Sequence, residues 1–138
     1  RDAEYCGLYK GTPIEDIVPV YFSPEWDTYE TENFGVSKER TIQPFKLKCV
    51  EPDHPVTQGI DWSGVPPIAG YNKCASVKGK TLVVNEGTND PVLVTGECGY
   101  GKTAIFLTCY SRGWASNMRE WSNFNRLWNN LIKWLAKK

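Results

Sequence analysis

Residues 91–109 read Pro-Val-Leu-Val-Thr-Gly-Glu-Cys-Gly-Tyr-Gly-Lys-Thr-Ala-Ile-Phe-Leu-Thr-Cys, and this stretch decides the fold. From Gly96 to Thr103 it satisfies the phosphate-loop pattern G-x-x-x-x-G-K-[ST], which on its own would predict a nucleotide hydrolase. The pattern works chemically only where a strand enters the loop and a helix leaves it. The start of that helix then aims backbone N–H groups at the phosphates.

The residues on either side of the glycines favour a β-hairpin over the phosphate loop. Residues 92–94 are an apolar, β-branched run typical of a strand, and residues 104–109 are a second short apolar run that predicts another buried strand instead of a helix. A glycine-rich segment of about four residues joins them, which is typical of a hairpin. We expect Gly99 and Gly101 to provide its positive-φ positions. Nucleotide hydrolysis by Gly96 to Thr103 stays as an alternative.

The composition is that of a globular protein without a strongly charged partner. The chain has 138 residues, of which 41% are hydrophobic, and its 16 basic residues balance 16 acidic ones. That balance indicates neither nucleic acid nor a membrane as a partner. The five cysteines are scattered without a Cys-x-x-Cys pair, which favours reduced thiols in the cytoplasm and predicts no metal site. No cofactor is expected.

The chain begins at Arg1, and its one methionine is Met118. We therefore expect residues 1–138 to be either a single domain or the C-terminal part of a longer one. Further strands are expected at residues 17–22, 45–50, 70–77 and 81–84. The polar residues 23–43 predict a loop, in which the acidic pair Glu30 and Glu32 is solvated.

The C-terminal segment predicts an amphipathic helix. From Arg119 to Lys138, apolar residues including Ile132 recur at intervals of three and four, so they form one stripe that a sheet can cover. Ser116 or Asn117 is expected to cap its start. The coarse pattern is thus several strands followed by one covering helix.

Three residues are candidates for catalysis. His54 is the chain's one histidine, so a histidine general base would have to be this residue. Cys109 ends an expected strand before a glycine-containing loop, and Glu97 lies beside Cys98 in the hairpin. Each has a structural alternative, because a histidine in a turn often only forms a hydrogen bond in its loop and a cysteine in a strand often packs as a small apolar residue. Arg112 follows the last strand and is a candidate for binding an anion.

Short motifs in a fixed order carry a resemblance to a known family. They are Gly11-Thr12-Pro13-Ile14, Pro19-Val20, His54-Pro55-Val56-Thr57-Gln58-Gly59-Ile60 with Trp62, Gly70-Tyr71-Asn72, Gly99-Tyr100-Gly101-Lys102, Trp114, and Trp121, Leu127-Trp128, Leu131 and Trp134-Leu135. In this order they resemble the C-terminal half of bacterial, cytoplasmic proteins described as putative glutamine amidotransferases. The resemblance implies an α/β fold of the flavodoxin-like, class I glutamine amidotransferase-like kind, here its strand-rich C-terminal portion with a β-hairpin and a terminal amphipathic helix.

The resemblance also implies a ligand site in the loops after the strands. Its candidate residues are Tyr71, Asn72, Arg112 and Trp114. Class I glutaminases use a cysteine on a strand-to-helix elbow together with a His-Pro-Glu-like segment, whereas the segment here is His-Pro-Val and begins at His54. Relatives also carry an arginine in the hairpin, where this chain has Thr103 and Ala104, and a histidine before the tryptophan that corresponds to Trp114.

These departures predict a catalytically degenerate domain that binds a small ligand or a partner. The enzyme alternative is an amidotransferase-like hydrolase whose nucleophile lies upstream of this chain. Unpaired edges of the sheet favour a homo-oligomer.

Overall fold

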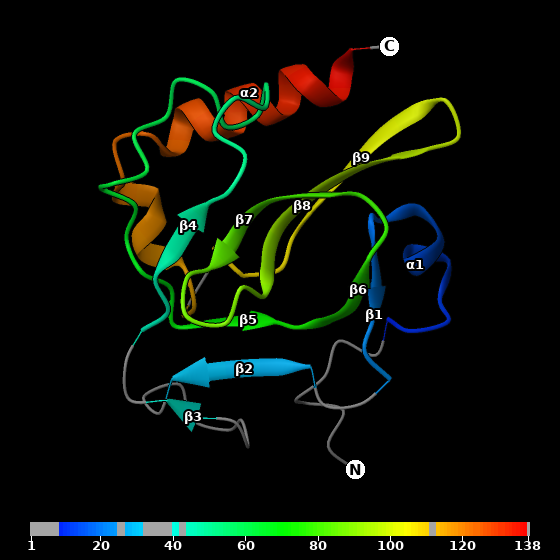
Figure 1. The fold of residues 1–138 in the computed structure, drawn as a ribbon, viewed down its shortest axis with the longest axis horizontal. Coiled ribbons are helices and arrows are strands. Elements are labelled where there is room, and N and C mark those ends of the chain that lie inside the picture. The colour runs from blue at the N-terminus through cyan, green and yellow to red at the C-terminus, as the bar shows by residue number, and fades with distance from the viewer. Residues whose placement is uncertain (1–8, 25–26, 32–39, 42–43, 111–112, 138) are drawn as a thin grey trace.

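In the computed structural model, residues 9–24, 27–31, 40–41, 44–110 and 113–137 are described. These residues form three small β-sheets and a C-terminal helix, so the chain combines sheet and helix as an α/β fold does (Figure 1). The largest sheet has the order β4-β7-β8-β9 and is antiparallel throughout. Its strands are β4 (Leu47–Cys49), β7 (Lys80–Asn85), β8 (Pro91–Cys98) and β9 (Gly101–Phe106).

The core lies between this sheet and α2 (Phe124–Ala136), which crosses the top of Figure 1. Leu127 and Leu131 on the helix are buried in one cluster with Leu82 and Leu93 from the sheet. This contact confirms the apolar stripe predicted from the sequence. Ile132 was assigned to the stripe wrongly, because its side chain is 60% exposed.

The predicted start of the helix is also wrong. Residues Ser116–Glu120 form a separate 3₁₀ turn, η3, and α2 begins only after Asn123, whose side chain makes no capping hydrogen bond. The chain is extended at Trp121, with φ −69° and ψ 130°, so the helical path stops there. This break lets the Trp121 indole enter the core before the helix begins.

The hairpin prediction is confirmed, and the phosphate-loop alternative is contradicted. Strands β8 and β9 pair from Leu93↔Phe106 to Cys98↔Gly101, so no helix follows the glycines. The turn consists of two residues, with Gly99 at φ 58° in the first position and Tyr100 in the second, as a tight hairpin with glycine first requires. Gly101 is the first residue of β9 and has no positive φ, so its predicted role was wrong.

Two smaller sheets carry the remaining strands. The three-stranded sheet has the order β3-β2-β5, and the two-stranded sheet pairs β1 with β6. The elements are α1 (Pro13–Ile17), β1 (Val20–Phe22), β2 (Thr28–Thr31), β3 (Arg40–Thr41), β5 (Gly70–Asn72) and β6 (Cys74–Val77). Residues 70–77 thus divide between two sheets instead of forming one strand.

The polar stretch 23–43 was predicted as a loop, and its described part corrects that prediction. Strand β2 lies beside β5 in Figure 1, and Thr28, Glu30 and Thr31 are all buried. Contrary to the expectation from the sequence, Glu30 is therefore buried and not solvated. Within the described ranges, no helix is long and apolar enough to cross a bilayer.

Candidate ligand-binding site

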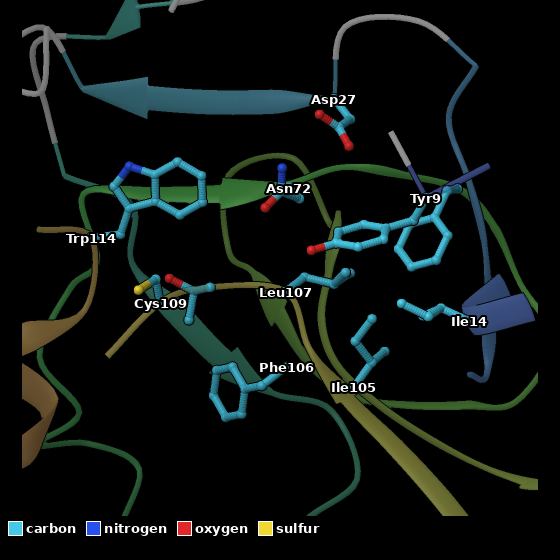
Figure 2. A pocket seen from close by; sticks show the side chains of 11 residues that line it. Tyr9, Ile14, Asp27, Asn72, Ile105, Phe106, Leu107, Cys109 and Trp114 are labelled. Carbon is cyan, nitrogen blue, oxygen red and sulfur yellow. The ribbon is translucent and has the colours of Figure 1, made fainter. Parts of the chain in front are cut away.

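A pocket of about 330 Å³ opens where the chain leaves β9 and passes β5 (Figure 2). Its apolar side comes from α1, β1 and the end of β9, through Ile14, Phe22, Ile105, Phe106 and Leu107. Its polar side comes from Asp27, Asn72, Thr108, Cys109 and Trp114. The hydroxyl of Tyr9 points between the two sides. A small concave site with an apolar body and a few convergent polar groups is typical of ligand pockets.

Backbone hydrogen bonds place the polar side. The N–H of Asn72 donates to the carbonyl of Leu107 over 2.8 Å, and the N–H of Ala69 donates to the carbonyl of Trp114 over 2.6 Å. The hydroxyl of Thr108 also donates to the carbonyl of Gly70 over 2.7 Å. Strand β5 therefore has β2 on one side and parts of the chain after β9 on the other. Asn72, Thr108 and Trp114 reach one pocket because of this arrangement.

The register of β2 and β5 separates their side chains onto two faces. Thr28 lies opposite Asn72 and Glu30 opposite Gly70, whereas Tyr29 lies opposite Tyr71 between them. Because successive side chains of a strand point to opposite faces, the first two pairs share a face and the tyrosines share the other. We call these the pocket face and the core face of the β2–β5 ribbon.

On the pocket face, the Trp114 indole lies directly on the backbone of β5. An ideal Cβ at Gly70 would be only 2.6–2.7 Å from indole Cε2, Nε1 and Cδ1, so only glycine allows this approach. The indole N–H donates to Oε1 of Glu30 over 2.7 Å. Glu30 is 7% exposed, and among the described residues its Oε2 has no hydrogen-bond partner. The pocket wall therefore depends on a buried carboxylate that is only half satisfied.

On the core face, Tyr71 is fully buried between aromatic rings. Its ring centroid lies 5.6 Å from that of Tyr29 and 5.1 Å from that of Phe45. Its hydroxyl donates to Asp90 over 2.6 Å and accepts from Asn85 Nδ2 over 3.0 Å. Burial, followed by the hydrogen bond to Asp90, raises the pKa of this phenol. Tyr71 was predicted to contact a ligand, and the structure places it in the core instead.

The structure brings three of the predicted site residues together and places Tyr71, Glu97 and His54 elsewhere. Asn72, Cys109 and Trp114 line the same pocket. Arg112 lies outside the described residues. Glu97 is exposed on the hairpin, where the strand register places it opposite Lys102. It does not line this pocket.

His54 lies in a turn beside α2, away from the pocket. Its Nδ1 accepts a hydrogen bond from the N–H of Val56 over 3.2 Å, and its ring centroid lies 5.5 Å from that of Trp134. Partial burial lowers the pKa of this imidazole, with a further contribution from Lys80. Because His54 is the chain's one histidine, the thiol of Cys109 has no histidine base from this chain in the pocket.

The sequence analysis missed Asp27, which lines the pocket, and Glu30, which bonds to the pocket residue Trp114. Both are polar residues in a polar stretch, where neither hydrophobic periodicity nor a motif marks them. Within the described part of the chain, no group of three or more His, Cys, Asp or Glu side chains could hold a metal ion.

Comparisons with known proteins identify relatives of this chain. Residues 3–137 match the family described as "Putative glutamine amidotransferase". The cytoplasmic protein STM3548 from Salmonella typhimurium has a similar solved structure, with 28% sequence identity and a TM-score of 0.77 over 94% of this chain and 48% of that one. The cytoplasmic protein STM1381 from Salmonella typhimurium LT2 is 26% identical, with a TM-score of 0.74 over the same shares.

The chain thus spans about half the length of these two solved structures. Among curated protein sequences, none matches it.

Proposed function

Because this chain belongs to the putative glutamine amidotransferase family, we propose that it binds a small molecule in the pocket beside β5 and does not hydrolyse glutamine with its own residues. One observation carries the proposal. Asn72, Cys109 and Trp114 converge on a pocket of about 330 Å³, whereas the chain's one histidine lies elsewhere.

The chemistry of the lining supports binding over covalent catalysis. A cysteine becomes a nucleophile when a neighbouring base or positive charge lowers its pKa, and attack needs that base within about 3 Å. Cys109 lies in the pocket, but the imidazole of His54 instead accepts a backbone hydrogen bond in its own turn. In this proposal the thiol contacts the ligand, and no histidine of this chain serves as its base.

The finer fold assignment is also a proposal. In it, the chain is the C-terminal portion of a flavodoxin-like domain in the cytoplasm. The 48% share of the similar structures supports a portion, and their printed descriptions as cytoplasmic proteins support the location. The large sheet described here is antiparallel, so the parallel strands of such a domain would lie in its remaining portion. The second candidate function is a hydrolase whose nucleophile comes from that portion.

Ligand-induced stabilisation tests the binding proposal. A metabolite library is screened against the chain by thermal denaturation, since a ligand at about 100 times its Kd stabilises by about 2.7 kcal/mol. We expect a ligand whose stabilisation is reduced by Asn72→Leu and by Cys109→Ser. Glu97→Gln on the exposed hairpin is the matched control and should leave it unchanged.

Two results would contradict the proposal. One is a screen in which no compound stabilises the chain through the pocket residues. The other is release of ammonia from glutamine by the isolated chain, lost in Cys109→Ser, because that would assign catalysis to this thiol. Ammonia release only by a longer natural protein would support the hydrolase alternative.

A further inference from the structure

The indole of Trp114 is held in place more firmly than core packing requires. Its ring rests on Gly70 at a distance that excludes any Cβ, and its N–H donates to Glu30 over 2.7 Å. An indole N–H that lines an open pocket could bond to water without cost. Here it instead bonds to a carboxylate that is 7% exposed and whose Oε2 has no partner among the described residues.

Burying such a carboxylate costs free energy, because its second oxygen loses water and gains no donor. An apolar residue at position 30 would avoid that cost. The one hydrogen bond recorded for the Glu30 side chain serves to fix the orientation of a pocket residue. Costly polar groups of this kind are typical of sites where geometry serves function. Glu30 therefore acts on the pocket through Trp114 and is a positioning residue.

Two polar groups of the wall, on Asn72 and Thr108, present acceptors to the pocket, beside the hydroxyl of Tyr9 and the thiol of Cys109. Asn72 Nδ2 donates to Thr28 Oγ1 over 3.4 Å, and that hydroxyl donates to Asp27 over 3.4 Å. These two hydrogen bonds orient the side-chain amide of Asn72 so that its oxygen points toward the pocket, as Figure 2 shows. The Thr108 hydroxyl uses its proton on the carbonyl of Gly70, so its lone pairs remain for an incoming donor.

The indole adds a flat surface to these acceptors. One face of its five-membered ring is covered by Gly70, and its N–H is occupied by Glu30. What Trp114 offers a ligand is therefore π surface and no hydrogen-bond donor. Figure 2 shows the ring face-on beside Asn72 and Cys109. Flat heteroaromatic rings stack on such a surface, and amino groups at their edges donate in the ring plane.

We propose that the pocket takes a flat, amino-substituted heteroaromatic ligand, which stacks on Trp114 and donates N–H hydrogen bonds to Asn72 and Thr108, with Glu30 as the positioning residue of the indole. This inference rests on the binding function proposed above. It names the ligand class of that site and the residue that sets its selectivity.

The test compares ligands that carry amino N–H donors with counterparts in which methyl groups replace those hydrogens. Adenine, cytosine and 2-aminopyridine, each beside its counterpart with a dimethylated amino group, are titrated calorimetrically into the full chain. We expect at least one of the three amino compounds to bind about 10-fold more tightly than its dimethylated counterpart, a difference of about 1.4 kcal/mol. Asn72→Leu should reduce this ratio several-fold, because it removes one of the two proposed acceptors and leaves Thr108 in place. Binding by none of the six compounds, or equal binding within every pair, would overturn the ligand class.

Variants of Glu30 test its positioning role. Glu30→Leu removes the acceptor and frees the indole N–H, so the ratio between amino and dimethylated compounds should fall several-fold. Glu30→Gln keeps an oxygen for the indole and should restore the ratio, with Glu97→Gln as the exposed control. A purely structural role would lower the melting temperature of Glu30→Leu and leave the ratio unchanged. If Glu30→Leu does not fold, Trp114→Phe gives the test instead. It keeps an aromatic ring but removes the N–H that Glu30 holds, so the ratio should fall several-fold, whereas a purely structural role of Glu30 predicts an unchanged ratio.

The two proposals can fail separately. If glutamine or glucose binds in a manner that depends on Asn72 and Cys109 while none of the six compounds binds, the binding function stands and the ligand class is wrong. If no compound of any class binds through these residues, both are wrong.

Discussion

The β2–β5 ribbon carries a polar centre on each face, and the two centres differ in how completely they are satisfied. On the core face, the Tyr71 hydroxyl donates to Asp90 and accepts from Asn85, and Thr88 lies within 3.4 Å. On the pocket face, Glu30 has one hydrogen bond, to Trp114, and its other oxygen has no partner within the described residues. Gly70 and Tyr71 are neighbours in sequence, yet Gly70 contacts Trp114 on the pocket face and Tyr71 belongs to the hydrogen-bond network on the core face.

This difference in hydrogen bonding predicts that the core face mainly affects stability and the pocket face also affects ligand binding. A buried network whose members are all paired adds to the stability of the fold and fixes its geometry. A buried network with one unpaired member costs stability, and its retention needs another explanation. Substitutions at the core face should therefore change the free energy of unfolding, whereas those at the pocket face should change ligand binding as well.

The largest effect is expected for Gly70→Ala. Its Cβ would lie 2.6 Å from atoms of the Trp114 ring, so the indole must move. We expect a loss of about 3 kcal/mol of stability, the upper part of the usual cost of overpacking, together with loss of ligand affinity. Denaturant unfolding and calorimetry measure the two. Gly64→Ala is the matched control, because its Cβ would meet the indole of Trp121 at 3.8 Å, an ordinary contact. Equal behaviour of the two variants would refute the close approach.

Tyr71→Phe should have the next largest effect. It removes a hydroxyl with hydrogen bonds to Asp90 and Asn85 and leaves the aromatic packing in place. We expect a loss of about 1–2 kcal/mol in denaturant unfolding, because Asn85 is buried and loses an acceptor. Ligand affinity should not change. A variant that loses affinity as well would show that the two faces of the ribbon are coupled.

Lys102→Ala touches neither centre and should have a smaller effect. Its ammonium donates to the carbonyl of Lys137 over 2.9 Å and lies 5.4 Å from the centroid of the Trp134 ring. We expect a loss of about 0.5–1 kcal/mol, since the contact is near the surface. Because Lys102 lies on a strand, magnesium–ATP should bind neither wild type nor variant in calorimetry. Binding that the variant abolishes would restore the phosphate loop.

The smallest effect is expected from the pH dependence at His54. Burial lowers its pKa below the ordinary 6.5, so below that pH the unfolded chain binds the proton more readily than the folded chain. Stability from this group is complete above about pH 6.5 and is lost as the pH falls through the folded pKa. His54→Asn should flatten the decline in unfolding free energy between about pH 7 and 5. An equal decline in the variant would show that other groups cause it.

Patterns of neighbouring residues in the sequence correctly predicted two elements, the hairpin and the apolar stripe of α2. The hairpin follows from two apolar runs around Gly99, and the stripe on α2 follows from the spacing of Leu127 and Leu131. The start of α2 could not be predicted from periodicity, because Trp121 keeps the helical spacing while its backbone is extended. Burial of that indole depends on the whole fold.

The site was predicted in part for the same reason. Asn72, Cys109 and Trp114 were found because they follow expected strands or match family motifs. Asp27 and Glu30 carry no such signal, because their burial arises from the pairing of β2 with β5, across about 40 residues of sequence. Tyr71 was misplaced because its neighbours Gly70 and Asn72 do face the pocket, and only the register shows which face each residue takes.

That register makes the three-residue strand β5 intolerant of small insertions and deletions. A shift by one residue would carry Tyr71 to the face that Trp114 covers and would bring Gly70 or Asn72 to the place of the core tyrosine. The aromatic cluster of Tyr29, Phe45 and Tyr71 would lose its central ring. The indole of Trp114 would no longer lie against a glycine. In evolution, the ligand preference of this pocket can therefore change by substitution around the strand, whereas a change in the strand's length would remove the pocket and the core together.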